Sequence, residues 1–340
     1  MIGDKGSALS TDGAMGTVDR VVQVQVKRPT AAKTTAGGTP RAKVDAAQVQ
    51  RTRLQGYRRR KTTNAVMLAF AVLCAMIALL PLFAIAIYVA VQGVSSLNLD
   101  FFTHAQYQVD TSGFGVPLGI GNTILGTLLL VVVACVIGLP IGLLSGIYLA
   151  EFGRGRFANI VRFVADVMAG LPSIVAGLVG YAVVVAAMGG NFSALAGGFA
   201  LGLLMFPVVT RATEEVLRLV PTSLREGGLA LGIPRWRVIA SIVVPTAASG
   251  IVTSMLLGVA RVTGETAPLI FTSFSNSYWN ANPLHAVGAL PYTIYYYATN
   301  EPDPTYHKMA FAGALILVGV VVLLNLIARL IFRQRVQGRT

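Results

Sequence analysis

Two ionisable side chains, Arg261 and Glu265, lie deep within a run of apolar residues at 243–272. Arg261 is eighteen residues from the start of that run, which in a helix corresponds to roughly 27 Å. Charges at such a depth normally face a bundle interior or an aqueous pathway. A guanidinium offers a fork of N–H donors that matches two oxygens of a tetrahedral oxyanion, and its charge is not lost by titration. The two residues are therefore candidates for an anion pathway.

Two further considerations bear on this candidate pathway. The four-residue spacing also permits an ion pair between Arg261 and Glu265 on one helix face, which is the purely structural alternative. In a pathway, Glu265 would temper the positive potential, because an anion that is held too tightly cannot leave. Arg211, near the end of the apolar run at 194–213, is a third candidate, although its side chain could instead reach the membrane surface.

A charged segment between two apolar runs, Thr222–Pro245, forms a second candidate site. Ser223 with Glu226 three residues later is a capping-box pattern, so we expect a helix to begin at the next residue after Ser223. Gly232 is placed to end this helix in a left-handed cap, and Pro234 suits the first position of another helix. The sequence predicts two short helices joined by a tight turn, which we call the elbow.

The elbow carries two kinds of side chain. On its polar face we expect Arg225, Glu226, Arg235 and Arg237. Its apolar side chains are Leu224, Leu229, Leu231, Trp236 and Ile239. We expect a partner to bury this surface.

Composition places the whole chain among polytopic membrane proteins. Hydrophobic residues make up 54% of it and charged residues only 12%, which excludes an ordinary soluble domain. Each of six apolar runs is long enough to cross a bilayer core of roughly 30 Å. These runs cover 64–91, 119–150, 163–188, 194–213, 243–272 and 309–332. Cys74 and Cys135 lie within them and are expected to be buried, without disulfide or metal.

The net charge of +13 follows membrane topology and does not indicate nucleic-acid binding. Thirteen of the 27 Lys and Arg precede the first run, and most others follow the second, fourth and sixth. The alternate loops, 92–118, 189–193 and 273–308, contain only one basic residue, Lys308. Because basic loops stay in the cytoplasm, we expect both termini and the elbow to be cytoplasmic.

The domain organisation follows from these runs. We expect residues 1–61 to form a basic cytoplasmic tail whose first fifty residues are disordered. A six-helix membrane domain would cover 62–335, with the coupling segment at about 214–245, and 336–340 would be a short cytoplasmic tail. Pro140 is expected to break the second span, and Pro172 with Ser173 to break the third beside a cavity.

Two stretches of sequence resemble permease subunits of ABC importers. Glu226-Gly-Gly, Gly232 and Ile242-Val-Val-Pro245 resemble the "EAA" loop, which in that family forms the coupling helix that docks on the ATPase. Two glycines replace the usual Ala-Ala and would loosen the helix by roughly 1 kcal/mol each. The run Arg261-Val-Thr-Gly-Glu-Thr-Ala-Pro-Leu, with Pro291-Tyr-Thr-Ile-Tyr-Tyr-Tyr-Ala298, is similar to phosphate-specific members.

This resemblance, over residues 64–335, implies an all-α type I ABC importer permease with six transmembrane helices. It implies that Arg261 and Arg211 take part in the passage of phosphate. It also implies that the residues that couple the permease to the ATPase are Ser223, Arg225, Glu226, Gly232 and Trp236. The implied partners are a homologous permease in a heterodimer, cytoplasmic ATPase subunits and an extracytoplasmic phosphate-binding protein, in a bacterial inner membrane. Mg-ATP would bind the ATPase subunits, since this chain has no Gly-x-x-x-x-Gly-Lys-Ser/Thr loop. We expect a transport subunit and not an enzyme.

Two other functions remain open from the sequence. The same architecture would suit another oxyanion, such as sulfate or molybdate. A secondary transporter or channel would use Arg261 and Glu265 as a proton-linked or gating pair without an ATPase. An external aromatic cluster indicates an interfacial belt or, alternatively, a docking surface for a binding protein. Its members are Tyr278, Trp279, Tyr292, Tyr295, Tyr296 and Tyr297.

Overall fold

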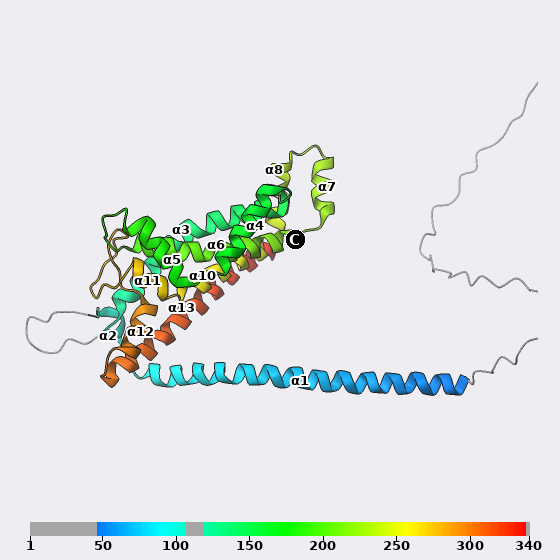
Figure 1. Ribbon diagram of the computed structural model, residues 1–340, viewed down its shortest axis with the longest axis horizontal. Helices are drawn as coiled ribbons and strands as arrows, with labels where there is room; N and C mark the ends of the chain where they lie inside the picture. The colour runs from blue at the N-terminus through cyan, green and yellow to red at the C-terminus, as the bar shows by residue number, and fades with distance from the viewer. Residues whose placement is uncertain (1–45, 107–118, 338–340) are drawn as a thin grey trace, which may run out of the picture. The chain divides into compact units, whose positions relative to one another are not determined.

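The computed structural model describes residues 46–106 and 119–337, and all regular elements in these residues are helices (Figure 1). The chain divides after Leu73 into two units, and helix α1 contributes to both. The helices before the elbow are α1 (Ala46–Val94), α2 (Leu99–Thr103), α3 (Gly121–Glu151), α4 (Arg156–Ala169), α5 (Ser173–Gly180) with the π-helical η1 (Tyr181–Val185), and α6 (Ala194–Arg218). The remaining helices are α7 (Thr222–Ala230), α8 (Arg235–Val238), η2 (Ile239–Val243), α9 (Val244–Thr246), α10 (Ala248–Thr263), α11 (Ala267–Thr272), α12 (Leu290–Thr299) and α13 (Pro304–Gln337).

The apolar runs become four straight spans and two bent ones. The straight spans are Lys61–Val94, Gly121–Glu151, Ala194–Arg218 and Pro304–Leu323. The bent pairs are Arg156–Ala169 with Ser173–Val185, at 108°, and Arg235–Thr246 with Ala248–Thr263, at 75°. Counting each pair as one span gives the six predicted from the sequence.

Prolines explain one of these bends, but not every proline breaks its helix. The predicted break at Pro172 is confirmed: α4 ends at Ala169, and Pro172, with an extended ψ of 136°, lies directly before α5. The predicted break at Pro140 is wrong, since α3 runs through it without interruption. Helices in membrane proteins tolerate an internal proline when neighbouring groups satisfy the freed carbonyl.

Helix α1 is longer than the first apolar run. It begins at Ala46, so the prediction of disorder to residue 50 is wrong for 46–50, where Ala, Gln and Val follow one another and Ala and Gln favour a helix. Residues 1–45 of the predicted tail, and 338–340, lie outside the described residues. In the second unit, α1 meets α13 near Gly93, where Tyr88 and Phe311 pack edge to face with ring centroids 5.3 Å apart.

Glycines bring α3 and α6 close together. Gly138, Gly142 and Gly146 recur every four residues on one face of α3. A Cβ atom at Gly142 would lie 2.8 Å from Cβ of Val209, and one at Gly146 would lie 2.7 Å from Cβ of Thr213. These glycines permit the close packing of the two helices, because a side chain at either position would collide with α6.

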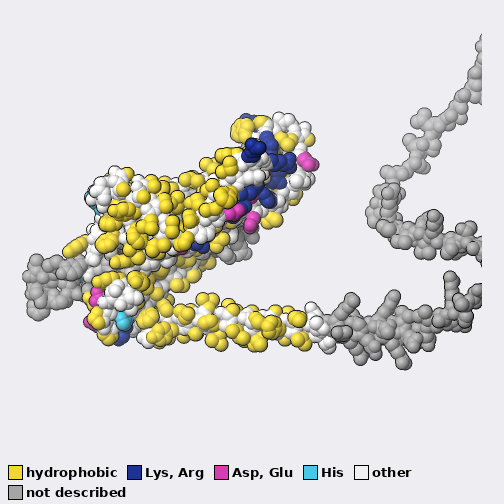
Figure 2. Space-filling model, viewed as in Figure 1, with side chains coloured by type: hydrophobic (Ala, Val, Ile, Leu, Met, Phe, Trp, Pro, Cys, Tyr) yellow, Lys and Arg dark blue, Asp and Glu magenta, His cyan; other side chains and the backbone are white. Residues whose placement is uncertain are grey.

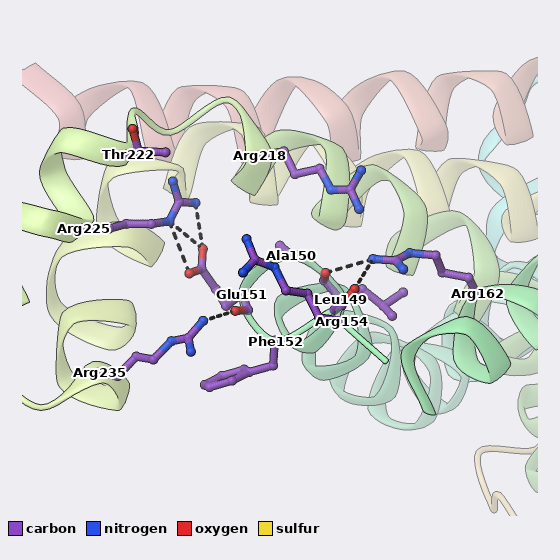
Figure 3. Close-up of a pocket in the computed structure, with 11 residues that line it drawn as sticks. Leu149, Ala150, Glu151, Phe152, Arg154, Arg162, Arg218, Thr222, Arg225 and Arg235 are labelled. Atoms are coloured by element: carbon purple, nitrogen blue, oxygen red, sulfur yellow. Dashed lines mark hydrogen bonds and ion pairs between the residues drawn. The ribbon is translucent and has the colours of Figure 1, made fainter. Parts of the chain in front are cut away.

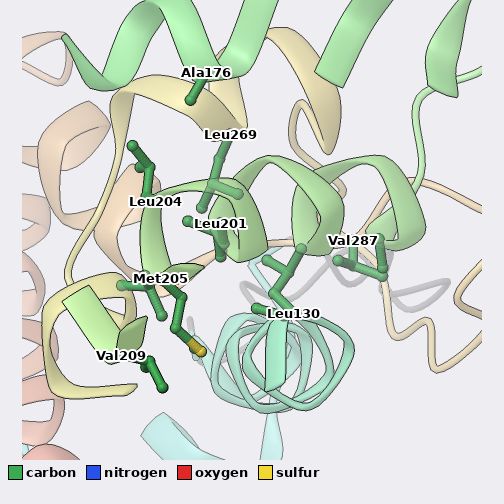
Figure 4. Packing of buried hydrophobic residues seen from close by; sticks show 12 residues of the cluster. Leu130, Ala176, Leu201, Leu204, Met205, Val209, Leu269 and Val287 are labelled. Carbon is green, nitrogen blue, oxygen red and sulfur yellow. The ribbon is translucent and has the colours of Figure 1, made fainter. Parts of the chain in front are cut away.

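The main apolar core of the second unit forms along this contact. Leu130, Leu201, Met205, Val209 and Leu269 are buried together there (Figure 4). They come from α3, α6 and α11. This core fixes α6 as the helix against which α3, α4, α5 and α10 are placed, and α6 ends close to the elbow.

Gly142→Val is expected to lower the free energy of unfolding by about 1–3 kcal/mol, because overpacking of a dense core has that cost. Gly319→Val in α13 is the matched control, since none of the described residues has an atom within 4 Å of a Cβ atom there. Thermal unfolding of both variants in detergent would measure the difference. Equal effects of the two substitutions would contradict the close packing of α3 on α6.

Candidate functional site

The elbow consists of α7 and α8, as its sequence predicts, but its first helix starts differently. Helix α7 begins at Thr222 directly after Pro221, and no side chain caps it. The predicted capping box is therefore wrong: Ser223 lies within the first turn, where it cannot serve as the cap. Gly232 has φ = 74°, which confirms the left-handed cap. Pro234 immediately precedes α8, one position earlier than predicted.

The two elbow glycines have different surroundings. Gly227 faces open space, whereas a Cβ atom at Gly228 would lie 2.9 Å from a methyl group of Val238 in α8. Gly228 is buried between the two elbow helices.

Gly227→Ala is therefore expected to stabilise α7 by roughly 1 kcal/mol. Gly228→Ala is expected to leave the stability of α7 unchanged or to push α7 away from α8. Hydrogen exchange of the elbow amides in the two variants would measure this difference. A similar gain of protection in both would show that α7 and α8 are not in close contact.

The outer surface of the elbow combines apolar side chains with one carboxylate and an exposed arginine, Arg237. Glu226 is exposed, and Leu231 and Trp236 are 81% and 63% exposed. Leu224 and Leu229 are exposed as well, as predicted for a surface that a partner buries. Ile239 is only 6% exposed, so its prediction as a surface residue is wrong: it belongs to the π-helical turn that packs inward after α8.

Arg225 points into the protein and not toward a partner. Its Nε and Nη2 donate to Oε1 of Glu151 at 3.0 and 2.7 Å (Figure 3). Nη2 also donates to the carbonyl of Leu217 at 2.8 Å. The carboxylate of Glu151 is 5% exposed. The prediction of Arg225 on the outward polar face is corrected, because the last turn of α3 offers this guanidinium a buried acceptor.

Arg235 makes a second link between the elbow and the end of α3. It donates a hydrogen bond to the main-chain carbonyl of Glu151 and lies over the ring of Phe152 at 4.6 Å. Helices α7 and α8 are thus each fastened to the end of α3. A displacement of the elbow would pull on this membrane span directly.

Glu214 is the centre of a second charged network at the same end. Its carboxylate is 3% exposed and pairs with Arg162, Arg211 and Arg218. Nε of Arg162 donates to Oε1 at 3.0 Å, and Nη1 of Arg211 donates to Oε2 at 3.3 Å. Because Arg162 comes from α4 and the others from α6, the network holds these helices together.

Arg211, predicted for the substrate pathway, therefore has two acidic partners. Besides Glu214, it donates from Nε to Oδ1 of Asp166 at 3.0 Å. Asp166 is exposed in α4, and the guanidinium of Arg211 is 33% exposed. Much of its hydrogen-bonding capacity is already used, so an anion reaching Arg211 would compete with two carboxylates.

Arg261 and Glu265 do not form the intrahelical pair that their spacing allows. Helix α10 ends at Thr263, and Gly264 follows it, so Glu265 lies in the break before α11, off the helical face of Arg261. The side chain of Arg261 is exposed. Within the described residues, neither side chain has a hydrogen bond or an ion pair. Arg261 thus keeps all its donors for a ligand or a partner.

Helix α5 packs against the start of α11, directly after the break that contains Glu265. A Cβ atom at Gly177 in α5 would lie 2.7 Å from Cα of Pro268, the second residue of α11. Non-helical backbone at membrane depth is tolerated only beside packed protein or a water-filled cavity. The break that contains Glu265 is therefore supported by α5.

Aromatic residues and Gln106 line a cavity of about 450 Å³ at the opposite end. Tyr295 and Tyr296 are exposed, while Tyr297 is 4% exposed, and burial raises the pKa of Tyr297 to about 12. The amide of Gln106 donates to Thr293 at 3.1 Å. Both predictions for the aromatic cluster, belt and docking surface, remain predictions.

Sequence reasoning missed Glu151 and Glu214 as organising residues. Each lies at the end of a span among basic residues, which made it look like a surface charge. The available signal for Glu151 was a carboxylate directly after the apolar residues of its span, because a buried charge must be paired. Glu214 is followed by Glu215 and gave no such signal. Within the described residues, no group of three or more His, Cys, Asp or Glu is placed to hold a metal ion.

Comparisons with known proteins agree with this architecture. Residues 138–337 match the family described as binding-protein-dependent transport system inner membrane component. The chain is 42% identical over 286 residues to the phosphate transport system permease protein PstA of Yersinia pestis, covering 84% of this chain and 94% of that relative. It is 40% identical over 276 residues to PstA 1 of Mycobacterium tuberculosis (strain CDC 1551 / Oshkosh), covering 80% and 90%.

A solved structure shares the fold. A chain of the inward-facing MetNI methionine ABC transporter superposes with a TM-score of 0.51 at 20% identity, covering 64% of this chain and 94% of that one. A second crystal form gives 0.50 at 21% identity, covering 63% and 92%. This likeness concerns the arrangement of helices alone.

Proposed function

Because the chain belongs to the family of binding-protein-dependent transport system inner membrane components, and is thus a multi-pass membrane protein and a transport component, we propose that it is the permease subunit of an ATP-driven importer of inorganic phosphate. Phosphate is proposed as the substrate because the chain is about 40% identical, over 80% or more of its length, to relatives named as phosphate permeases. Arg261 supports it chemically, since its fork of donors is free to bind an oxyanion.

We place the phosphate route along Arg261 and Glu265. The exposed guanidinium would lie at an interface with a homologous, PstC-like permease subunit, so that the route forms between the two subunits. Glu265 lies in a break supported by α5 and would weaken anion binding enough for release. Arg211 is a proposed pathway residue nearer the cytoplasm. Its guanidinium already pairs with Asp166 and Glu214, so a passing anion would compete with these carboxylates.

Coupling to ATP hydrolysis would run through the elbow. Glu226, Leu231 and Trp236 form the exposed surface that a cytoplasmic, PstB-like ATPase subunit with bound Mg-ATP would bury. Ser223 lies in the first turn of α7 beside this surface, and Gly232 shapes the turn. Arg225 would act inside the protein, where its bonds to Glu151 connect elbow displacement to α3 and hence to alternating access.

The remaining features of the proposal concern topology. Both termini and the elbow would be cytoplasmic, with 1–61 as a basic tail, 62–335 as the membrane domain and 336–340 as a short tail. The end that carries α12 would then face outward, toward a PstS-like phosphate-binding protein.

Uptake of labelled phosphate into vesicles that contain this chain and its partner subunits tests the function. We expect uptake to require ATP and to be insensitive to excess sulfate. Sulfate competition would assign another oxyanion, and uptake without any ATPase would reject the importer in favour of a secondary transporter.

A pair of substitutions separates docking from transmission. Glu226→Lys should prevent co-purification of the ATPase subunit, because it reverses the one charge on the exposed face of α7. Arg225→Gln should leave co-purification intact and uncouple ATP hydrolysis from uptake. The reverse pattern would show that Arg225 faces the ATPase.

A further inference from the structure

A cavity of about 480 Å³ lies between the elbow and the end of α3. Five arginines line it, together with a single carboxylate. In Figure 3, Arg225 and Arg235 come from the elbow on one side, Arg162 and Arg218 from the opposite side, and Arg154 from the turn after α3. Figure 2 shows Lys and Arg side chains gathered over the same end of the second unit, where α7 and α8 lie. The lining thus has an excess of four positive charges.

Three of these guanidiniums keep unused hydrogen-bond donors. A guanidinium has five N–H donors. Arg154 is exposed, and in the described part of the chain its guanidinium has no hydrogen bond and no ion pair. Among the described residues, Arg218 donates only through Nη2, to Glu214, and Arg235 only through Nη2, to the carbonyl of Glu151. Glu151 and Glu214 are both already engaged, so the described residues supply no further anion to this cavity.

We propose that the cavity between Arg154, Arg218 and Arg235 binds a phosphate oxyanion, either the headgroup phosphate of an anionic lipid or free inorganic phosphate from the cytoplasm. Arginine forks bind phosphate oxygens in pairs, and such charge-assisted bonds are about twice as strong as neutral ones. One phosphate brings up to two negative charges and several acceptors, which suits the excess charge better than the single carboxylate of a protein side chain.

The surroundings are those of a membrane surface. Leu219, next to Arg218, is 81% exposed, and Phe157, three residues after Arg154, is 63% exposed. Apolar side chains beside arginines are typical of the depth at which lipid phosphates lie. A bound phosphate would bridge the turn after α3 to α8, adding a third tie between the elbow and this span. The site would be distinct from the transport route, because none of its residues is Arg261 or Glu265.

The test is thermal unfolding of the purified complex in nanodiscs, with chloride exchanged for phosphate at constant ionic strength. One set contains phosphatidylcholine alone, and the other an equal mixture of phosphatidylcholine and phosphatidylglycerol. Wild type should be stabilised by at least one source of phosphate. Arg154→Gln should weaken the apparent affinity for phosphate by about tenfold, because the loss of one charge-assisted hydrogen bond corresponds to about this factor. Arg156→Gln, two residues away and outside the cavity lining, should match wild type.

The arms of this experiment separate the possible occupants. A stabilisation by added phosphate in phosphatidylcholine alone that Arg154→Gln reduces assigns free phosphate, because phosphate bound along Arg261 would stabilise both variants alike. A stabilisation that appears only with phosphatidylglycerol and that Arg154→Gln reduces assigns the headgroup. Equal responses of wild type and Arg154→Gln would overturn the proposal. So would an effect of Arg154→Gln that appears only when the ATPase subunit binds, since this would assign the arginines to a protein carboxylate. Because stability is measured, the result is independent of whether the complex transports phosphate.

Discussion

Arg261→Gln is expected to reduce ATP-dependent phosphate uptake by about tenfold to a hundredfold. The substitution leaves a shorter, uncharged amide and so removes the charge and most of the hydrogen-bond donors. Each charge-assisted hydrogen bond to an anion contributes about 1.5–3 kcal/mol, and 1.4 kcal/mol corresponds to tenfold in affinity. We expect uptake to fall without a loss of folded protein. In the described residues, Arg261 makes no ion pair whose removal would destabilise the fold.

Arg261→Lys provides the graded comparison. It keeps the positive charge but presents a point charge without the planar fork, so we expect uptake between wild type and Arg261→Gln. The amount of complex in the membrane and the co-purified ATPase serve as controls, and both should be unchanged. Undiminished uptake by Arg261→Gln would remove Arg261 from the pathway. A loss of assembled complex would instead assign it to the contact with the second permease subunit.

The fold is largely predictable from the sequence because its elements depend on local signals. Six apolar runs of membrane length and the alternation of basic loops predict the spans. The left-handed glycine at 232 and the break at Pro172 are local features too, and both are confirmed. Pro140 shows the limit: whether a proline interrupts a helix depends on neighbouring backbone and side chains, and the sequence does not place these.

The candidate site is less predictable because its geometry depends on tertiary contacts. Spacing places Arg261 and Glu265 on one helix face, but Gly264 ends the helix between them. Arg225 looks like a surface charge until the end of α3 supplies Glu151 as its acceptor, 74 residues away in the chain. Long-range pairs of this kind leave no periodic pattern. They are the contacts that make the elbow part of the membrane domain.

Glu214→Gln is expected to lower the free energy of unfolding by about 3 kcal/mol. Removing one partner of a buried ion pair costs about 3–5 kcal/mol, because the remaining charges stay uncompensated. Here three guanidiniums, those of Arg162, Arg211 and Arg218, would face a neutral amide. We expect the low end of the range, since the side chain of Arg218 is 57% exposed and is solvated without Glu214. Thermal unfolding in detergent measures the effect.

Glu215→Gln is the matched control, because it removes the same charge one residue later in the same helix. Glu215 is exposed, and an exposed single charge contributes at most about 1 kcal/mol. Hydrogen exchange provides a second readout: if Glu214 holds α4 against α6, its loss should also accelerate exchange in both helices, whereas the control should not. Equal stability of the two variants would show that the three arginines are hydrated in the membrane protein, and that α4 is held to α6 by its apolar contacts alone.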